Sequence, residues 1–179
     1  EGTHGCVVLT GTFDDPYSGT TIEFQRGRDT SSEVQIDHVV ALSDAWQKGA
    51  QQLSEEQRRM LANDPLNLLA SDGSLNQSKG DGDAATWLPP HRPFRCAYVA
   101  RQVAVKHAYG LWVTQAEHDA IARVLDTCPG EELPAEDAAG RAPAPDDDGG
   151  SDDAGETGGS GGDGATAYAN CDEARAAGA

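Results

Sequence analysis

Apolar and polar residues alternate along two stretches near the start of the chain, 7–13 (VVLTGTF) and 20–26 (TTIEFQR). The intervening DDPYSG is typical of a chain reversal, because Asp, Pro, Ser and Gly favour turn backbone angles. This period-two alternation around a turn predicts a β-hairpin. A third strand is predicted at 34–37, where Val34 and Ile36 lead into Asp37.

Helical spacing follows this strand. Apolar or small residues three or four positions apart predict a first helix face, namely Leu42, Ala45, Trp46 and Gly49. Ser54 followed by Gln57 is a capping-box pattern for a second helix that continues to about Ala62. The Asp64-Pro65 dipeptide is expected to stop that helix, because the residue before a proline avoids helical angles.

The apolar run 66–70 predicts a fourth strand, followed by a turn at 71–74 and a short helix over 75–79. A longer helix is predicted over about 92–108, after Pro89-Pro90. A last helix is expected from the capping pair Thr114 and Glu117. Pro129-Gly130 ends it, and this predicts an α+β domain over residues 1–129.

The rest of the chain has a different composition. The formal net charge is −17, and residues 130–179 contribute most of it, with 13 acidic and 2 basic residues. The stretch 130–167 is rich in Gly, Asp, Ala and Pro and predicts a disordered acidic linker, because it lacks the apolar area that offsets ordering entropy. Residues 168–179 regain helix-forming residues.

The cysteines predict export rather than a metal site. The four, Cys6, Cys96, Cys128 and Cys171, contain no CxxC pair, so zinc-type spacing is absent and disulfides in a secreted protein are expected. Three pairings are open, and we favour Cys96–Cys128, which would join the last two helices. The sequence contains no apolar run of membrane-spanning length and no signal peptide. It lacks an initial Met, so a processed protein or a fragment is expected.

Asp37 and His38 carry the strongest chemical signal. A carboxylate binds a hard divalent cation, and a neutral imidazole accepts a proton from water. Neighbouring residues of a strand point to opposite faces, so the strand must end or twist here if both serve one site. The structural alternative is an Asp that caps the following turn beside a His that packs on the sheet.

Further along, Asn67 and the string NQSK (76–79) follow Asp37-His38 in order. This set, with the strings IDHVVAL, NDPLNLL and NQSKGD, resembles the HNH or ββα-metal nucleases, in particular their secreted bacterial branch. The resemblance extends to about Cys128. It implies a ββα-metal core, to which this chain adds an N-terminal hairpin and further helices.

The resemblance also implies roles for these residues. Asp37 and Asn76 would bind one Mg²⁺ ion, with Mn²⁺ as an alternative, because few protein ligands and several waters suit magnesium. His38 would activate the attacking water. Asn67 would support catalysis by tying down the loop or orienting His38. The implied reaction is hydrolysis of phosphodiester bonds to a 5′-phosphate and a 3′-hydroxyl, in DNA and with RNA left open.

Substrate contacts are expected from basic residues. Lys79 could reach a phosphate, or it could be a solvated residue at a helix end. Arg92, Arg95 and Arg101, with Lys106, lie in a helical window without acidic residues, which predicts either a substrate-binding basic face or an ordinary solvated one. The tryptophans Trp46, Trp87 and Trp112 are expected in the core.

The string YANCDEARAAG near the end resembles the opening of the Excalibur calcium-binding repeat, although the acidic calcium loop that should follow is absent. Two other functions therefore stay open. One is a calcium-dependent surface or matrix protein with an inactive core, and the other is a nuclease toxin with an immunity partner. We favour a secreted, metal-dependent endonuclease of low sequence specificity, with nucleic acid as partner, no membrane association and no obligate protein partner.

Overall fold

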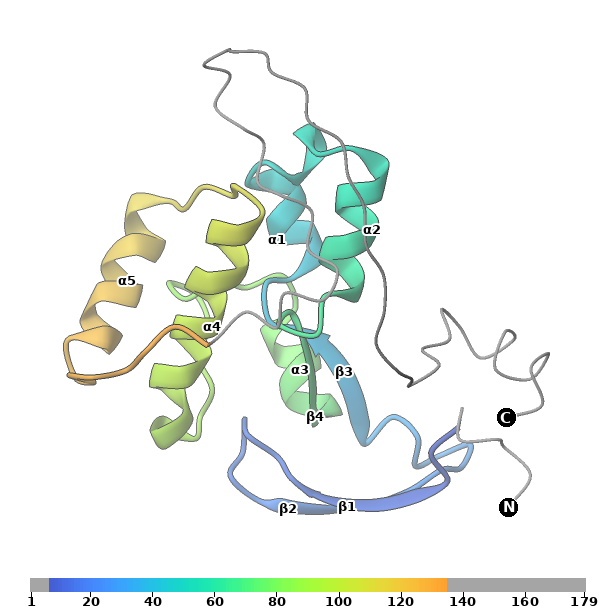
Figure 1. Cartoon of the computed structure of the whole chain (residues 1–179). Helices are drawn as coiled ribbons and strands as arrows, with labels where there is room; N and C mark the ends of the chain where they lie inside the picture. Colours follow the sequence, from blue (N-terminus) through green and yellow to red (C-terminus); the bar gives the residue numbers. More distant parts are fainter. Residues whose placement is uncertain (1–6, 135–179) are drawn as a thin grey trace, which may run out of the picture. The chain divides into compact units, whose positions relative to one another are not determined.

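The structure is a computed structural model that describes residues 7–134 (Figure 1). Residues 10–134 belong to one compact unit, which is described below. The predicted α+β class is confirmed. Apart from residues 130–134, the predicted acidic linker lies outside the described residues, as do the Excalibur-like segment, Cys6 and Cys171.

The predicted N-terminal hairpin is present. Strands β1 (Thr10–Asp14) and β2 (Thr21–Gln25) pair antiparallel. The Asp15 carboxylate accepts the N–H of Ser18 at 2.7 Å, and Gly19 has a φ of +73°, which only glycine adopts readily. The same carboxylate accepts the N–H of Asp72 at 2.9 Å, so the hairpin end is fastened to the second sheet.

The second sheet pairs β3 (Val34–His38) antiparallel with β4 (Leu68–Asp72), with Asp37 opposite Leu69. Strand β4 begins two residues later than predicted. The cause is a turn at Asp64, whose side chain accepts the N–H of Leu66 at 2.8 Å. Asn67 therefore lies in the turn before the strand and not in it.

The segment between these strands is helical. Helix α1 (Leu42–Gln47) ends before Gly49, whose φ of +119° starts the 3₁₀ turn η1 (Ala50–Gln52). Helix α2 (Glu55–Asn63) begins with the predicted capping box. The Ser54 hydroxyl accepts the Gln57 N–H at 3.1 Å, and the Gln57 side chain accepts the Ser54 N–H at 2.9 Å.

Helix α3 (Gly73–Lys79) follows β4 directly, which completes the predicted strand–strand–helix order. The Asp72 carboxylate caps it by accepting the N–H of Leu75 at 2.9 Å. Gly73 allows the close approach, since a Cβ here would lie 1.9 Å from the carbonyl oxygen of Ser32. The helix is thereby fixed against β3 and β4.

The 3₁₀ turn η2 (Arg92–Phe94) leads into α4 (Arg95–Ala108), and α5 (Gln115–Leu125) packs against it. The predicted Cys96–Cys128 disulfide is confirmed. The core contains Tyr17, Val39, Tyr98 and Val99, and it gathers apolar side chains from β4, α3, α4 and α5. No helix within residues 7–134 has the length and apolarity needed to cross a bilayer.

The tryptophan prediction is right for one residue of three. Trp87 packs on the core, with its ring centroid 5.1 Å from that of Tyr17. Trp46 and Trp112 are 51% and 54% exposed, so their prediction as core residues is wrong. Trp46 instead lies under the Arg58 guanidinium at 5.7 Å, an arrangement that shields one ring face without burying it.

Candidate functional site

Asp37 is buried near the end of β3. Its Oδ1 accepts a hydrogen bond from Lys79 Nζ at 2.9 Å, and its Oδ2 accepts one from the Tyr17 hydroxyl. Burial, reinforced by the neighbouring Tyr98 and Asp37, raises the pKa of Tyr17 far above its ordinary value of 10.0. Tyr17 therefore stays a neutral donor, and both oxygens of Asp37 are engaged.

Lys79, at the end of α3, is not the exposed residue expected for a phosphate contact. Its side chain is 0% exposed and pairs with Asp37. Its ammonium also donates to the backbone carbonyl of His38 at 2.8 Å. The cap from Asp72 and the close approach of Gly73 to Ser32 fix α3 so that Lys79 points toward β3. Its ammonium is therefore the buried counter-ion of the Asp37 carboxylate.

His38 is half-buried and uses different neighbours from Asp37. Its ring Nε2 lies 2.9 Å from the carbonyl oxygen of Ala62, on α2. A carbonyl can only accept, so Nε2 carries the proton in the neutral ring and Nδ1 holds a lone pair. The carbonyl of Ala62 thus fixes the tautomer that leaves Nδ1 free to take a proton.

Asp37 and His38 do not converge on one point. The strand does end at His38, as the sequence requires for a shared site, but both residues still occupy the β3–β4 ladder. Asp37 bonds to α3 and to Tyr17, whereas His38 bonds to α2. The expectation of a carboxylate and an imidazole facing one ion is therefore not met in this arrangement.

Asn67 is fully buried and holds the loop after β3. Its Oδ1 accepts the Val40 N–H at 2.8 Å, while its Nδ2 donates to the carbonyls of Val40 and Leu61 at 3.2 and 3.3 Å. Leu61 precedes Ala62, so Asn67 fixes the segment that carries the partner of His38. Of the two expected roles, these contacts support tying down the loop.

Asn76, the second expected metal ligand, lies on α3 and donates from Nδ2 to Gln35 Oε1 at 2.9 Å. Within the described part of the chain, no group of three or more His, Cys, Asp and Glu side chains has metal-binding geometry. Asp37 gives both oxygens to Lys79 and Tyr17. An ion shared by Asp37 and Asn76 does not fit the residues as they are arranged.

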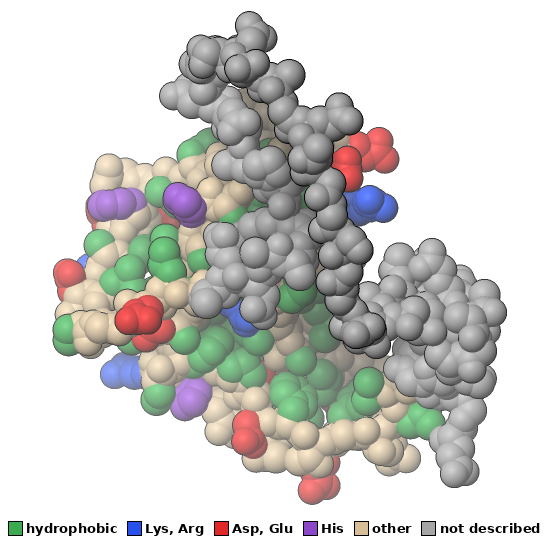
Figure 2. Space-filling view, viewed as in Figure 1, with side chains coloured by type: hydrophobic (Ala, Val, Ile, Leu, Met, Phe, Trp, Pro, Cys, Tyr) green, Lys and Arg blue, Asp and Glu red, His purple; other side chains and the backbone are tan. Residues whose placement is uncertain are grey.

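The predicted basic face on α4 is interrupted. Lys106 is buried, so it belongs to the interior and not to a binding face. Arg92 is exposed, Arg101 is half-buried, and Arg95 donates to the carbonyl of Pro89 at 2.7 Å. On the face shown in Figure 2, basic side chains lie scattered and form no continuous patch.

A buried ion network, which the sequence interpretation missed, joins three helices and the 81–83 turn. Lys48 lies 2.6 Å from Asp44, 2.7 Å from Asp83 and 2.7 Å from Glu117. Lys106 contacts Asp44 at 3.0 Å and also pairs with Glu117. The i,i+4 spacing of Asp44 and Lys48 is the one local signal that could have indicated it.

This network sets the charge states around it. Burial alone would lower the pKa of Lys48, but its hydrogen bonds to three carboxylates outweigh burial and raise that pKa. Burial alone would likewise raise the pKa of Asp83, yet the hydrogen bond and charge of Lys48 hold it below its ordinary value of 3.8. Lys48 and Asp83 therefore both stay charged at neutral pH.

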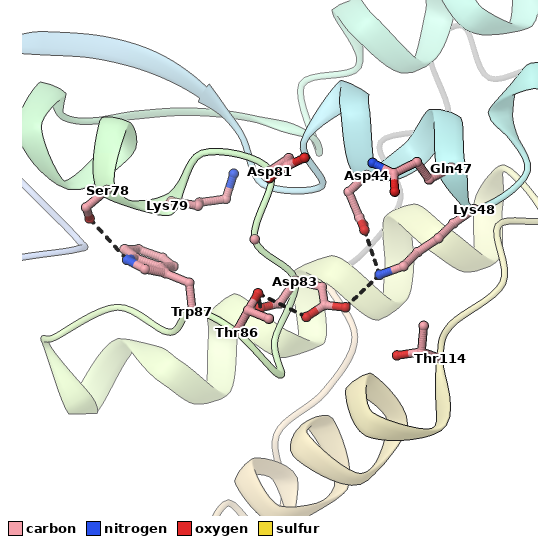
Figure 3. A pocket seen from close by; sticks show the side chains of 11 residues that line it. Asp44, Gln47, Lys48, Ser78, Lys79, Asp81, Asp83, Thr86, Trp87 and Thr114 are labelled. Carbon is pink, nitrogen blue, oxygen red and sulfur yellow. Dashed lines mark hydrogen bonds and ion pairs between the residues drawn. The ribbon is translucent and has the colours of Figure 1, made fainter.

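A cavity of about 510 Å³ separates the Asp37–Lys79 pair from this network. Figure 3 shows Asp81 between Lys79 and Asp44, and it shows Lys48 joined to Asp44 and to Asp83. Asp81 is exposed and accepts only a long hydrogen bond, 3.4 Å, from Ser43. His38 does not line this cavity.

Residues 1–124 match the family described as GmrSD restriction endonucleases, C-terminal domain. An uncharacterized secreted protein of Arthroderma benhamiae is 39% identical over 125 residues, which cover 69% of this chain and 58% of that protein. This relative is fungal, whereas the motifs resemble a bacterial branch. No solved structure matches the chain. Because the family match covers more than half of the 179 residues, the chain belongs to the family of GmrSD restriction endonuclease C-terminal domains.

Proposed function

We propose that this protein is an endonuclease that hydrolyses phosphodiester bonds of nucleic acid, with His38 as the general base. The observation that carries the proposal is the contact between His38 Nε2 and the carbonyl oxygen of Ala62, at 2.9 Å. It presents an unprotonated Nδ1 on a half-buried ring, as a general base requires. The family of restriction endonuclease domains supplies the substrate class.

In the proposed reaction, Nδ1 takes a proton from water as the water oxygen attacks phosphorus. The bond from phosphorus to the 3′ oxygen breaks, and that oxygen leaves as a hydroxyl after it gains a proton from solvent. The products are a 5′-phosphate and a 3′-hydroxyl, as the HNH resemblance implies. Asn67 and Ala62 are positioning residues here, because Ala62 bonds to the imidazole of His38 and Asn67 holds the loop after β3.

A divalent ion, Mg²⁺ or Mn²⁺, is proposed as cofactor on the HNH resemblance. The arrangement of Asp37 and Asn76 does not fit a shared ion, because both oxygens of Asp37 already accept hydrogen bonds from Lys79 and Tyr17. Whether hydrolysis depends on a divalent ion is tested by digestion in the presence of the chelator EDTA.

DNA is the proposed substrate, with RNA as the alternative, and sequence specificity is expected to be low. Arg92 lies exposed in η2, and Arg95 and Arg101 lie half-buried on α4; these three are the proposed phosphate contacts. Residues 1–129 carry more acidic than basic side chains, so salt-dependent phosphate binding should be weak. Weak binding to the phosphates of the nucleic acid fits an enzyme that releases its substrate after cleavage better than a protein that forms a stable complex with it.

We also propose that the protein is exported. The Cys96–Cys128 disulfide is of a kind that persists in oxidising compartments. The fungal relative is described as secreted, although the chain spans less than two thirds of its length.

The test is digestion of supercoiled plasmid and of single-stranded RNA, with and without EDTA, by the wild type, by His38→Ala and by His118→Ala. His118 is the matched control, because its side chain is 65% exposed and its ion-pair partner is the neighbouring Asp119. We expect His38→Ala to lose about two to four orders of magnitude in rate and His118→Ala to match the wild type. Equal rates for wild type and His38→Ala would remove His38 as the base.

A further inference from the structure

The carboxylate of Asp37 is already neutralised by a cation from its own chain. Lys79 Nζ lies 2.9 Å from Oδ1 and the Tyr17 hydroxyl donates to Oδ2, so neither oxygen faces solvent. The Lys79 side chain is fully enclosed. A buried carboxylate of this kind requires a positive partner, and the fold provides a lysine.

We propose that Lys79 is the resident cation of Asp37, and that a divalent metal ion binds this carboxylate only when the Lys79 ammonium has moved away. This role of Lys79 rests on the proposed nuclease function, but it is tested by metal binding in the absence of nucleic acid. Lys79 is in this view a positioning residue that controls access to Asp37.

Simultaneous binding is excluded by distance and charge. A hard divalent ion sits about 2.1–2.5 Å from a carboxylate oxygen. The Lys79 ammonium lies 2.9 Å from the same Oδ1. Two cations held so close in a buried site repel strongly, because little water screens them. Lys79 and the metal ion therefore compete for one position.

The cavity beside Lys79 offers the ammonium a second position. It has a volume of about 510 Å³, and its lining includes Lys79, Asp81 and Asp83 (Figure 3). Asp81 is exposed and its hydrogen bond from Ser43 is long, at 3.4 Å, so its carboxylate can receive a new partner. Four rotatable methylene groups let the ammonium swing while helix α3 stays in place.

Release of Lys79 also changes the end of β3. The same ammonium donates to the carbonyl of His38 at 2.8 Å, and this bond breaks when the side chain swings away. Metal arrival at Asp37 is thereby coupled to a loss of restraint on the residue proposed as general base. One lysine links the two neighbouring residues, although their side chains contact different elements.

The experiment measures Mn²⁺ binding by electron paramagnetic resonance and by the metal-induced rise in melting temperature, without nucleic acid. The variants are Lys79→Met, Asp37→Asn and the double variant. Lys79→Met leaves a buried carboxylate without its cation, so we expect Mn²⁺ to bind at least about tenfold more tightly than to wild type and to raise the melting temperature. The double variant, which lacks the carboxylate, should lose both effects.

Wild type and Asp37→Asn should bind Mn²⁺ equally weakly, because Lys79 holds the position in the wild type. If Lys79→Met does not fold, Lys79→Gln, which also removes the ammonium but keeps a polar end, takes its place with the same expected gain in Mn²⁺ affinity. Tight one-to-one binding by wild type that Asp37→Asn abolishes would overturn the proposal, as would unchanged affinity in folded Lys79→Met. Failure of the proposed nuclease function would instead show as an unaffected His38→Ala, a result independent of Mn²⁺ affinity.

Discussion

The side-chain amide of Asn67 is paired with both backbone groups of Val40. Its Oδ1 accepts the N–H at 2.8 Å, and its Nδ2 donates to the carbonyl at 3.2 Å. This amide acts as a substitute for a strand partner at the point where β3 has ended. It is also bonded to Leu61, so the loop after β3 and the end of α2 are held as one piece.

Asn67→Ala should destabilise the protein by about 3 kcal/mol, because it leaves buried backbone groups without hydrogen-bond partners. Urea unfolding measures the change, and Asn63→Ala is the control. Asn63 is exposed and donates only to the carbonyl of Arg59, so its loss should cost less than about 0.5 kcal/mol. Equal destabilisation by the two variants would contradict the role assigned to Asn67.

Glu117→Gln should destabilise the protein by about 2–3 kcal/mol. The glutamate is 0% exposed and accepts hydrogen bonds from the ammonium groups of Lys48 and Lys106. The Gln amide has one acceptor oxygen in place of two, so one buried charge-assisted hydrogen bond is lost, while Asp44 and Asp83 still balance the two lysines. Glu23→Gln, on the exposed side of β2, should change stability by no more than about 0.5 kcal/mol. Both values come from urea titration at neutral pH.

Asp83→Asn tests the pH dependence of the same network. The pKa of Asp83 is held below 3.8 in the folded protein, chiefly by Lys48 against the opposing effect of burial. Its stabilising contribution is therefore present above pH 3.8 and is lost as pH falls through the lower folded pKa. The stability difference between wild type and Asp83→Asn should be large at neutral pH and should narrow as the pH falls below 3.8. A difference that widens in acid would contradict this assignment.

Removal of the disulfide with Cys96→Ser and Cys128→Ser should lower stability by about 3–4 kcal/mol, since the bond closes a loop with a sequence separation of 32. Thermal unfolding of the variant is the measurement. Reduction of the wild type with dithiothreitol should give the same loss. A melting temperature that is unchanged in both experiments would show that the bond adds no stability.

Local patterns predicted most of the elements. Ser54 and Gln57 marked the start of α2 correctly, because a capping box depends only on residues three apart. The hairpin was predicted for the same reason, from alternation and a polar turn. Strand β4 was predicted two residues too early. Leu66 and Asn67 begin the apolar run, but they lie in a turn in which the Asp64 side chain accepts the N–H of Leu66.

The site was predictable in composition but not in arrangement. Lys79 has the composition of a solvated helix end, and only the packing of α3 on β3 shows that it is buried against Asp37. Tyr17, in the DDPYSG turn, gave no chemical signal, yet it donates to the same carboxylate. Trp46 is likewise exposed because α1 buries the face that carries Ala45. The helical spacing of the apolar residues alone did not determine which face is buried.

Helix α4 makes bonds of different kinds along its length: Cys96 to Cys128, just past the end of α5, Gln102 to the carbonyl of Val39 at 3.1 Å, and Lys106 to Asp44 and Glu117. Displacement of this helix would have to break a covalent bond, a buried hydrogen bond and an ion network together. Its amide protons should therefore exchange with solvent only on global unfolding, whereas those of the largely exposed β1–β2 hairpin exchange through local opening. In hydrogen-exchange terms, α4 belongs to the last cooperative unit to open and the hairpin to the first.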